Sequence, residues 1–348
     1  MTKAPFPDEP SRTSPTLEDV AQSAGVSTAT VSRCLNNPKM VSEKTRERVL
    51  SAVKTLGYTP NFGAQALAAK RTRTFGAIIP TMENAIFARG LQAFQEELQR
   101  HGITLLVASS SYNPELEEEQ IRSLVARGAD ALLLIGFDRT PQVYDFLKKQ
   151  RIPCVVAWVY DPSQSQLSIG FDNRSAMQAL TEQVLDLGHR AIAFVTAERD
   201  GNDRARLRCE GVEQAMLSRK LDAGNLHVIE TPYSIDNGAR ALEAAMELDP
   251  RPTAILCGND VLAAGALRQA RKMGLEVPRD VSITGFDDIE IAEIVTPALT
   301  TVHVPHRNMG KGAARMLVAL RKGEDAGSSV QLEATTKIRE SLGPAPQA

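Results

Sequence analysis

TLEDVAQSAGVSTATVSRCLNNPKMVSEKTRERVLSAVKTLGYTPNFGAQALAAK, residues 16–70, is the stretch of sequence that decides the fold of the N-terminal part of the chain. Thr16 and Asp19 have the spacing of a capping box, which predicts the start of a first helix. Gly25 ends that helix, because glycine tolerates the left-handed backbone of a tight turn. Ser27 follows at once and is a good cap for a second helix.

The second helix is predicted over Thr28–Leu35, with Val31 and Leu35 facing inward. A third helix starts after the cap residue Ser42 and ends at Gly57. Its apolar positions are Val49, Val53 and Leu56. Two short helices around a glycine turn, braced by a third, form the helix-turn-helix arrangement.

The outward side chains of the second helix suit DNA recognition, because the front of this helix enters the major groove in the motif. Arg33 can bond guanine through both arms of its guanidinium, and Ala29 and the methyl group of Thr28 can pack on a thymine methyl. Short side chains suited to phosphate contacts are Ser27, Thr30, Ser32, Asn36, Ser42 and Thr45. The alternative is that these polar groups serve only as helix caps and solvated surface.

Charge is distributed unevenly along the chain. Residues 16–73 hold nine basic and four acidic side chains, a net charge of +5, while the whole chain carries −2 and the remainder therefore −7. This asymmetry indicates a DNA-binding head joined to a body that DNA does not attract.

The segments TLEDVAQSAGVSTATVSRCLN, VSEKTRERV and LGYTPNFGAQALAAKRT resemble the head of the lactose-repressor (LacI/GalR) family of bacterial transcription regulators. With the body included, the resemblance covers Thr16 to Leu342. It implies that Thr28 and Ala29 are the main base-discriminating pair and that Arg33 contacts a base. The expected DNA-binding set also includes Thr16, Tyr58 and Asn61.

The same resemblance implies a hinge helix over Asn61–Ala69, with Leu67 as a minor-groove wedge and Ala64 and Ala68 beside it. Nine residues are too few for a stable isolated helix, because helices below about 12–15 residues are marginal in water. We therefore expect the hinge to order only with a second copy and DNA. A leucine pair inserted at a base step would bend the duplex. The alternative is a plain linker.

The chain has 348 residues, which suggests roughly two to three domains. It has no apolar run near membrane-spanning length, and its N-terminus is polar and proline-rich without the apolar region of a signal peptide. Cys34, Cys154, Cys209 and Cys257 lack metal-site or redox spacing. We expect reduced, mostly buried cysteines, no metal and no cofactor, in a cytoplasmic protein.

From Thr74 onward, continuous apolar runs alternate with helical patterns, which predicts parallel strands covered on both faces. There are too many such units for one sheet, so the body should form two doubly wound lobes. The resemblance implies a periplasmic-binding-protein-like fold whose chain crosses between lobes near 170–172, 301–304 and 329. The expected organisation is a disordered tail (1–15), a helix-turn-helix domain (16–60), a hinge (61–73), an effector-binding and dimerisation domain (74–342) and a tail (343–348). Lobe 1 would comprise about 74–170 and 303–328, and lobe 2 about 171–300 and 329–342.

Polar and aromatic residues follow several of the predicted strands, where ligands bind in doubly wound folds. An arginine fork, carboxylates and one aromatic ring suit a sugar-sized polar ligand. Arg208 and Asp287 fall at effector-contact positions by resemblance, with Asn259 near them and Trp158 opposite. The expected effector-binding residues are Ile86, Phe87, Trp158, Asp172, Arg208, Tyr233, Asn259 and Asp287.

Several residues also have a purely structural alternative role. Trp158 can be a core residue, Arg208 and Asp287 a plain ion pair, Asp260 a cap of the following helix and Asp288 a structural carboxylate. His303 and His306 are expected at the lobe crossover or the dimer surface rather than in a metal site.

Three functions compete. A solute receptor of a transporter would have the same two-lobed body, but it would not need a basic DNA-binding head. An enzyme on this scaffold lacks support, because Ile79–Asn84 after the first strand contains no glycine-rich phosphate loop. We therefore expect a homodimeric repressor that binds a pseudo-palindromic operator in double-stranded DNA. Its affinity should respond to a sugar, sugar acid or polyol, or alternatively to a nucleobase or another small metabolite.

Overall fold

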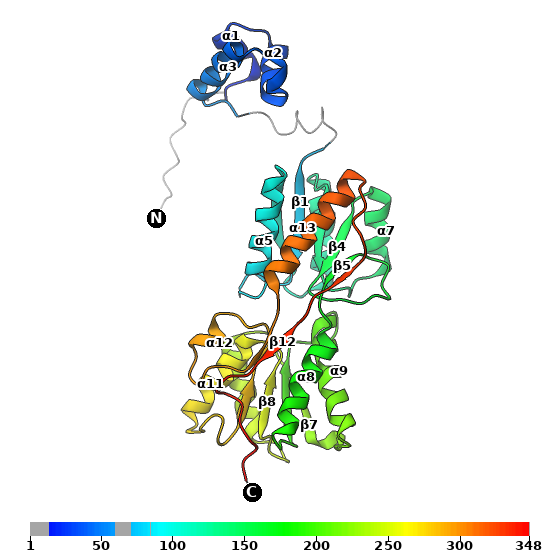
Figure 1. Cartoon of the computed structure of the whole chain (residues 1–348), viewed down its shortest axis with the longest axis vertical. Coiled ribbons are helices and arrows are strands. Elements are labelled where there is room, and N and C mark those ends of the chain that lie inside the picture. The colour runs from blue at the N-terminus through cyan, green and yellow to red at the C-terminus, as the bar shows by residue number, and fades with distance from the viewer. Residues whose placement is uncertain (1–13, 60–70, 84, 348) are drawn as a thin grey trace, which may run out of the picture. The chain divides into compact units, whose positions relative to one another are not determined.

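The computed structural model describes residues 14–59, 71–83 and 85–347. The chain divides into two compact units, residues 1–72 and 73–348, which we call the head and the body (Figure 1). The predicted hinge residues Asn61, Ala64, Leu67 and Ala68 and most of the predicted N-terminal tail lie outside the described residues.

The described part of the head, residues 14–59 and 71–72, contains three α-helices and a short 3-10 turn. These are α1 (Leu17–Ala24), α2 (Thr28–Asn36), η1 (Pro38–Met40) and α3 (Glu43–Leu56). The capping box forms as predicted: Asp19 donates its backbone N–H to Thr16 Oγ1 at 3.3 Å, and Thr16 N donates to the Asp19 carboxylate at 2.8 Å. Gly25 takes the left-handed conformation at the end of α1, with φ of 61°.

The head has its own apolar core, built on Val20, Val31 and Val49, which are fully buried. Cys34 rather than Leu35 is the second fully buried residue of α2, and Leu35 is half-buried. Arg48 of α3 donates hydrogen bonds to the carbonyls of Ala24 and Gly25, so it braces the turn between α1 and α2. The helix-turn-helix prediction is confirmed.

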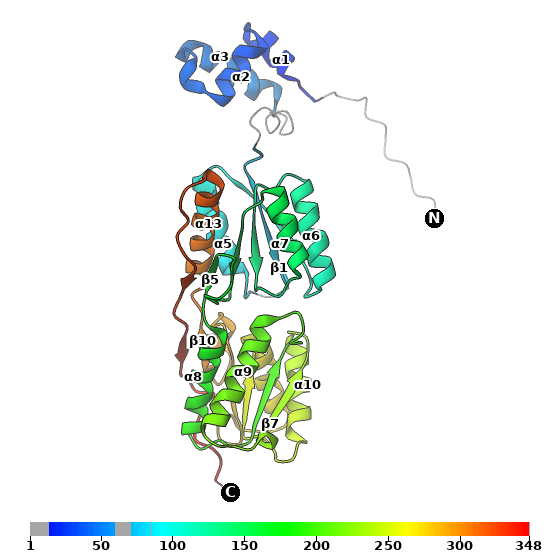
Figure 2. The same cartoon turned by 90° about the vertical axis from the view of Figure 1, so that its right-hand side faces the viewer.

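Lobe 1 of the body is a parallel sheet of six strands in the order β11-β5-β4-β3-β1-β2. Its strands are β1 (Thr74–Ile79), β2 (Thr104–Ser109), β3 (Ala131–Ile135), β4 (Cys154–Ala157), β5 (Ser168–Gly170) and β11 (Val330–Gln331). Its helices are α5 (Ala88–Arg100), α6 (Pro114–Ala126), α7 (Pro141–Gln150) and α13 (His306–Lys322). α5 and α13 cover one face of the sheet and α6 and α7 the other (Figure 2).

Lobe 2 is a parallel sheet of four strands in the order β7-β6-β8-β9. Its strands are β6 (Ile192–Thr196), β7 (Leu226–Glu230), β8 (Ala254–Cys257) and β9 (Ser282–Thr284). Its helices are α8 (Asn173–Asp186), α9 (Asp203–Ser218), η2 (Ala223–Asn225), α10 (Ile235–Met246), α11 (Asp260–Lys272) and α12 (Ile291–Ile294). α8 packs with α9, and α10 packs with α11.

Three chain crossings join the lobes. The first lies between β5 and α8. The second follows β10 (Thr301–His303), which pairs antiparallel with β12 (Thr335–Lys337). The third lies between β11 and β12, slightly later than Ser329, because β11 still pairs with β5 of lobe 1. These crossings make the carboxyl ends of both sheets face the same cleft.

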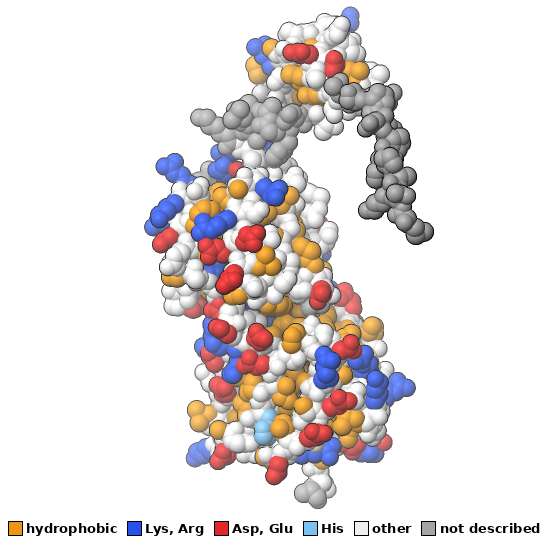
Figure 3. Space-filling view, turned by 180° about the vertical axis from the view of Figure 1, so that it is seen from behind, with side chains coloured by type: hydrophobic (Ala, Val, Ile, Leu, Met, Phe, Trp, Pro, Cys, Tyr) orange, Lys and Arg blue, Asp and Glu red, His pale blue; other side chains and the backbone are white. Residues whose placement is uncertain are grey.

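Further features concern the cysteines, possible metal ligands and the surface of the body. All four cysteines are free, and three of them are buried. The described residues contain no group of three His, Cys, Asp or Glu side chains that could hold a metal ion. None of the described helices has the length and apolar character needed to span a membrane. Figure 3 shows acidic and basic side chains interspersed over one face of the body, unlike the basic stripe of a DNA-binding surface.

The contact between α5 and α13 depends on two glycines, Gly90 and Gly310. A Cβ added to Gly310 would lie 1.9 Å from the carbonyl oxygen of Gly90, where backbone cannot move aside. We predict that Gly310→Ala lowers the free energy of unfolding of the body by about 1–3 kcal/mol, as overpacking does. Urea unfolding of the full chain measures it.

Gly312→Ala on the same helix is the matched control, because its Cβ would meet only Cδ1, the end of the Ile169 side chain. That side chain can rotate away. Equal losses of stability in the two variants would contradict the requirement for backbone contact at Gly310.

Candidate functional site

A cavity lies between the two lobes, at the carboxyl ends of their strands. Residues of lobe 1 form one wall and residues of lobe 2 the other. The lining residues are Ile86, Phe87, Tyr112, Trp158, Asn202, Arg204, Arg208, Tyr233, Asn259 and Asp287. The cavity shares Tyr112, Asn202 and Tyr233 with a wider groove that forms its mouth.

Asp287 is the most unusual residue of the cavity. Its backbone has φ of 103°, which is uncommon for any residue other than glycine. Its side chain is almost fully buried, and within the described residues neither carboxylate oxygen accepts a hydrogen bond. The nearest cation is the Arg208 guanidinium, with Nη2 at 3.7 Å from Oδ1. Burial raises the pKa of Asp287 to about 7, although Arg208 opposes the shift.

Arg208 is held in place from three sides. Its Nε donates to Asn173 Oδ1 at 2.9 Å, and its Nη1 donates to the Gly258 carbonyl at 2.5 Å. The guanidinium lies over the ring of Phe286, 3.8 Å from the ring centroid. A planar cation fixed in this way offers a preformed donor surface to a ligand.

Asn259 supplies a second unused polar group. Its Oδ1 caps α11 by accepting the N–H of Leu262 at 2.9 Å. Its Nδ2 is buried and finds no hydrogen-bond acceptor in the described parts of the chain. A donor and a carboxylate without partners in one cavity indicate a ligand that supplies the missing hydrogen bonds.

Aromatic rings supply the apolar surface of the cavity. Phe87 and Trp158 meet edge to face with centroids 5.4 Å apart, and Tyr112 and Tyr233 do so at 5.8 Å. Burial raises the pKa of Tyr112, so its hydroxyl stays protonated and can donate. Such rings pack on the C–H groups of a small polar ligand.

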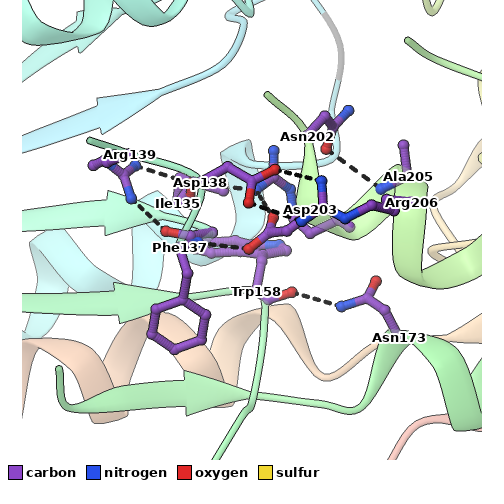
Figure 4. A network of polar contacts seen from close by, with 12 residues as sticks. Ile135, Phe137, Asp138, Arg139, Trp158, Asn173, Asn202, Asp203, Ala205 and Arg206 are labelled. Atoms are coloured by element: carbon purple, nitrogen blue, oxygen red, sulfur yellow. Dashed lines mark hydrogen bonds and ion pairs between the residues drawn. The ribbon is translucent and has the colours of Figure 1, made fainter. Parts of the chain in front are cut away.

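Cross-lobe contacts close the cleft beside the cavity. Arg206 makes two hydrogen bonds to Asp138, at 2.7 and 2.8 Å, and Asp203 accepts the N–H of Phe137 at 2.5 Å (Figure 4). Arg204 donates through Nη1 to Asp203 and to the Ile135 carbonyl. The start of α9 therefore docks on the turn that follows β3.

Seven of the eight expected effector residues line this cavity: Ile86, Phe87, Trp158, Arg208, Tyr233, Asn259 and Asp287. Asp172 does not. Its carboxylate caps α8 by accepting the N–H and the hydroxyl of Ser175, at 3.0 and 2.6 Å. The residue therefore serves as the N-cap of α8.

Asp260 also differs from its expected role as a cap, because Asn259 caps α11. The Asp260 carboxylate is buried and accepts Thr301 Oγ1 at 2.5 Å and the N–H of Ile289 at 2.8 Å. Asp288 is structural, as expected, since it pairs with Arg339 and His303 at 2.7 and 2.9 Å.

The expected effector set leaves out three lining residues: Tyr112 and Asn202, which sequence reasoning missed, and Arg204, which it placed only in the arginine-rich helix start after a strand. Tyr112 lies after β2, in a loop that ends at the helix start Asn113-Pro114. Asn202 caps α9. Tyr112 and Asn202 each follow a strand and precede a helix, which is the signal that could have found them, and Arg204 lies in the first turn of α9.

In the head, the structure places Thr28, Ala29 and Arg33 on the exposed surface of α2, while Thr30 and Ser32 are half-buried. Thr16, Ser27 and Ser42 cap the three helices. Asn36 donates to Ser32 at 3.3 Å, and Tyr58 packs on the head core beside the other half-buried residues. The remaining predicted phosphate contact, Thr45, is half-buried at the start of α3.

Comparison with known proteins identifies both parts. Residues 16–61 match the model of bacterial regulatory proteins of the lacI family, and residues 181–342 match a periplasmic binding protein-like domain. The HTH-type transcriptional regulator GntR of Escherichia coli K12 is 33% identical over 89% of this chain and 93% of its own length. The HTH-type transcriptional repressor PurR of Vibrio cholerae is 33% identical over 89% of this chain and 92% of its own.

Among solved structures, the lac repressor dimer bound to operator and the anti-inducer ONPF aligns with a TM-score of 0.82 at 27% identity. The alignment covers 94% of this chain and 99% of the repressor chain. These relatives are transcription regulators rather than enzymes. Together with the helix-turn-helix head and the two-lobed body, they show that the chain belongs to the LacI family and is a sequence-specific DNA-binding transcription regulator.

Proposed function

We propose that this protein is a repressor whose affinity for its operator is set by a small polar effector bound between the lobes of the body. The two unused oxygens of Asp287 carry the proposal. A buried carboxylate without hydrogen bonds is costly in free energy, and two ligand hydroxyls would satisfy it. Asn259 Nδ2 and Arg208 offer matching donors, which favours a sugar, sugar acid or polyol.

Two copies are needed for this function. Helix-turn-helix dimers bind half-sites related by two-fold symmetry, and the related lac repressor is a dimer on its operator. We propose that this chain also pairs through its body and reads a pseudo-palindromic site in double-stranded DNA with Thr28, Ala29 and Arg33. A regulator of genomic DNA works in the cytoplasm.

The hinge region links the two activities in this proposal. Leu67 would enter the minor groove, with Asn61, Ala64 and Ala68 alongside. The effector would change the relative orientation of the lobes and thereby the spacing of the two hinges. Such a coupling between sites is typically 1–3 kcal/mol and is reciprocal.

The first experiment is a thermal-shift screen of the full chain against sugars, aldonates, polyols and nucleobases. A ligand at 100 times its dissociation constant stabilises a protein by about 2.7 kcal/mol. Stabilisation by a polyhydroxylated compound supports the proposed effector class. Stabilisation by nucleobases alone would contradict a sugar, sugar acid or polyol effector and indicate a nucleobase instead. No stabilisation by any compound would count against a small-molecule effector site in this cavity.

Asp287→Asn should abolish the response to the compound found in the screen, because it replaces one of the two acceptor oxygens by an NH2 donor. The same change should stabilise the effector-free protein. The folded-state pKa of Asp287, about 7, lies above the reference value of 3.8, so wild-type stability falls as pH rises between these values. At pH 8 we expect the Tm of the variant to exceed that of wild type, with the difference vanishing near pH 4.

Asp172→Asn is the matched control, because asparagine also caps helices and position 172 lies outside the cavity. It should leave both the response and the pH dependence unchanged. An Asp287→Asn variant that still responds to the compound would remove Asp287 from the site.

Arg33→Ala should weaken binding to the operator by about 1–3 kcal/mol while affecting random DNA far less, because a base contact discriminates between sequences. Fluorescence anisotropy with an operator selected from genomic fragments measures both affinities. Lys39→Ala, which removes an exposed charge from η1, should weaken the two affinities by the same factor. An equal loss on both DNAs for Arg33→Ala would contradict its base-reading role.

A further inference from the structure

Two buried side chains that do not line the cavity connect its opposite walls. Asn173, the first residue of α8, donates Nδ2 to the carbonyl of Trp158 at 3.0 Å and accepts Arg208 Nε at 2.9 Å. It is fully buried. One amide thus joins the aromatic wall of lobe 1 to the arginine of lobe 2, and Figure 4 shows its bond to Trp158.

His306, the first residue of α13, makes the second connection. Its Nδ1 lies 3.1 Å from the indole Nε1 of Trp158, and its Nε2 lies 3.1 Å from the carbonyl oxygen of Asp287. The indole nitrogen can only donate, so Nδ1 accepts and Nε2 carries the hydrogen. Burial lowers the pKa of His306 to about 4, which keeps the ring neutral, as both bonds require.

These bonds support the two strained residues of the cavity. Trp158 and Asp287 both have positive φ, 64° and 103°. Asn173 binds the carbonyl of Trp158, and His306 binds the carbonyl of Asp287. Backbone in such conformations persists only where its surroundings hold it.

The connections form a closed ring, because Arg208 lies 3.7 Å from Asp287. We call Trp158, His306, Asp287, Arg208 and Asn173 the cross-lobe ring. The indole also rests on α5, since a Cβ at Gly90 would lie 2.4 Å from it. The position of Trp158 is therefore fixed by both lobes together.

We propose that His306 and Asn173 are positioning residues that assemble the two walls into one binding site by holding Trp158 against Asp287 and Arg208. The significance of this assembly rests on the proposed effector function. The ring consists only of side chains and carbonyls of this chain, so it can be tested independently of the effector.

Trp158 is the only tryptophan of the chain, so its fluorescence reports on the ring. The experiment measures the emission maximum and acrylamide quenching of the effector-free full-length protein. In His306→Phe and Asn173→Leu, loss of the hydrogen bonds should loosen the lobes around the indole. We expect a red shift of the emission and a rise in quenching in both variants.

His189→Phe is the matched control. His189 is also fully buried and also makes two hydrogen bonds, to Thr253 Oγ1 at 2.9 Å and to the Gly343 carbonyl at 3.0 Å, but it lies outside the ring. It should lower the Tm and leave Trp158 emission unchanged. His306→Gln, which retains an acceptor and a donor, should restore much of the wild-type signal and serves if the phenylalanine variant does not fold.

The double variant His306→Phe/Asn173→Leu tests whether the ring acts as a unit. We expect it to change the emission no more than the stronger single variant. Additive shifts, a shift in His189→Phe as large as in His306→Phe, or wild-type emission in both single variants would each overturn the proposal. An intact fluorescence signature together with a failed effector screen would contradict the proposed function alone.

Discussion

The proposed binding site depends on the buried carboxylate of Asp287. Its ionised form, with neither oxygen accepting a hydrogen bond from the described residues, raises the free energy of the folded protein. Only Arg208, at 3.7 Å, offsets part of that cost. The strained backbone at positions 287 and 288 and the buried bonds around it keep the carboxylate in place. A ligand that donates hydrogen bonds to this carboxylate would lower the free energy of the folded protein.

A ligand can make these contacts only while both lobes line the cavity, as they do in this structure. The start of α9 carries Asp203, Arg204 and Arg206 to the turn after β3, and the same helix carries Arg208 into the cavity. Ligand binding and lobe position therefore involve one helix. The crossings between the lobes lie beside the cavity, so a change at the site can alter the orientation of lobe 1, from which the chain leads to the head.

Much of this could be predicted from the sequence, because the governing interactions are local. Thr16 with Asp19, Gly25 and Ser27 specify helix ends through contacts a few residues apart, and all of these contacts form. Alternating apolar runs gave the right fold class for the body. Some cavity residues that follow strands, such as Trp158 and Asn259, were also expected there, since the fold brings these strand ends together.

The roles of several individual side chains could not be predicted from the sequence, because they depend on contacts between residues that are distant in the chain. Asp172 and Asn259 both follow strands and both cap helices, yet only Asn259 lines the cavity. Asp260 was expected to cap its own helix but binds Thr301, 41 residues away. His306 was expected at the crossover, and its two partners, Trp158 and Asp287, are distant in sequence.

The most direct measurement is the reciprocal linkage between the two binding sites. With the compound found in the screen, the Kd for the operator is measured with and without saturating compound, and the Kd for the compound with and without operator. We expect both to change by the same factor, of about 5–150-fold. A compound that binds the cleft while leaving the Kd for the operator unchanged would contradict control of DNA binding by the body.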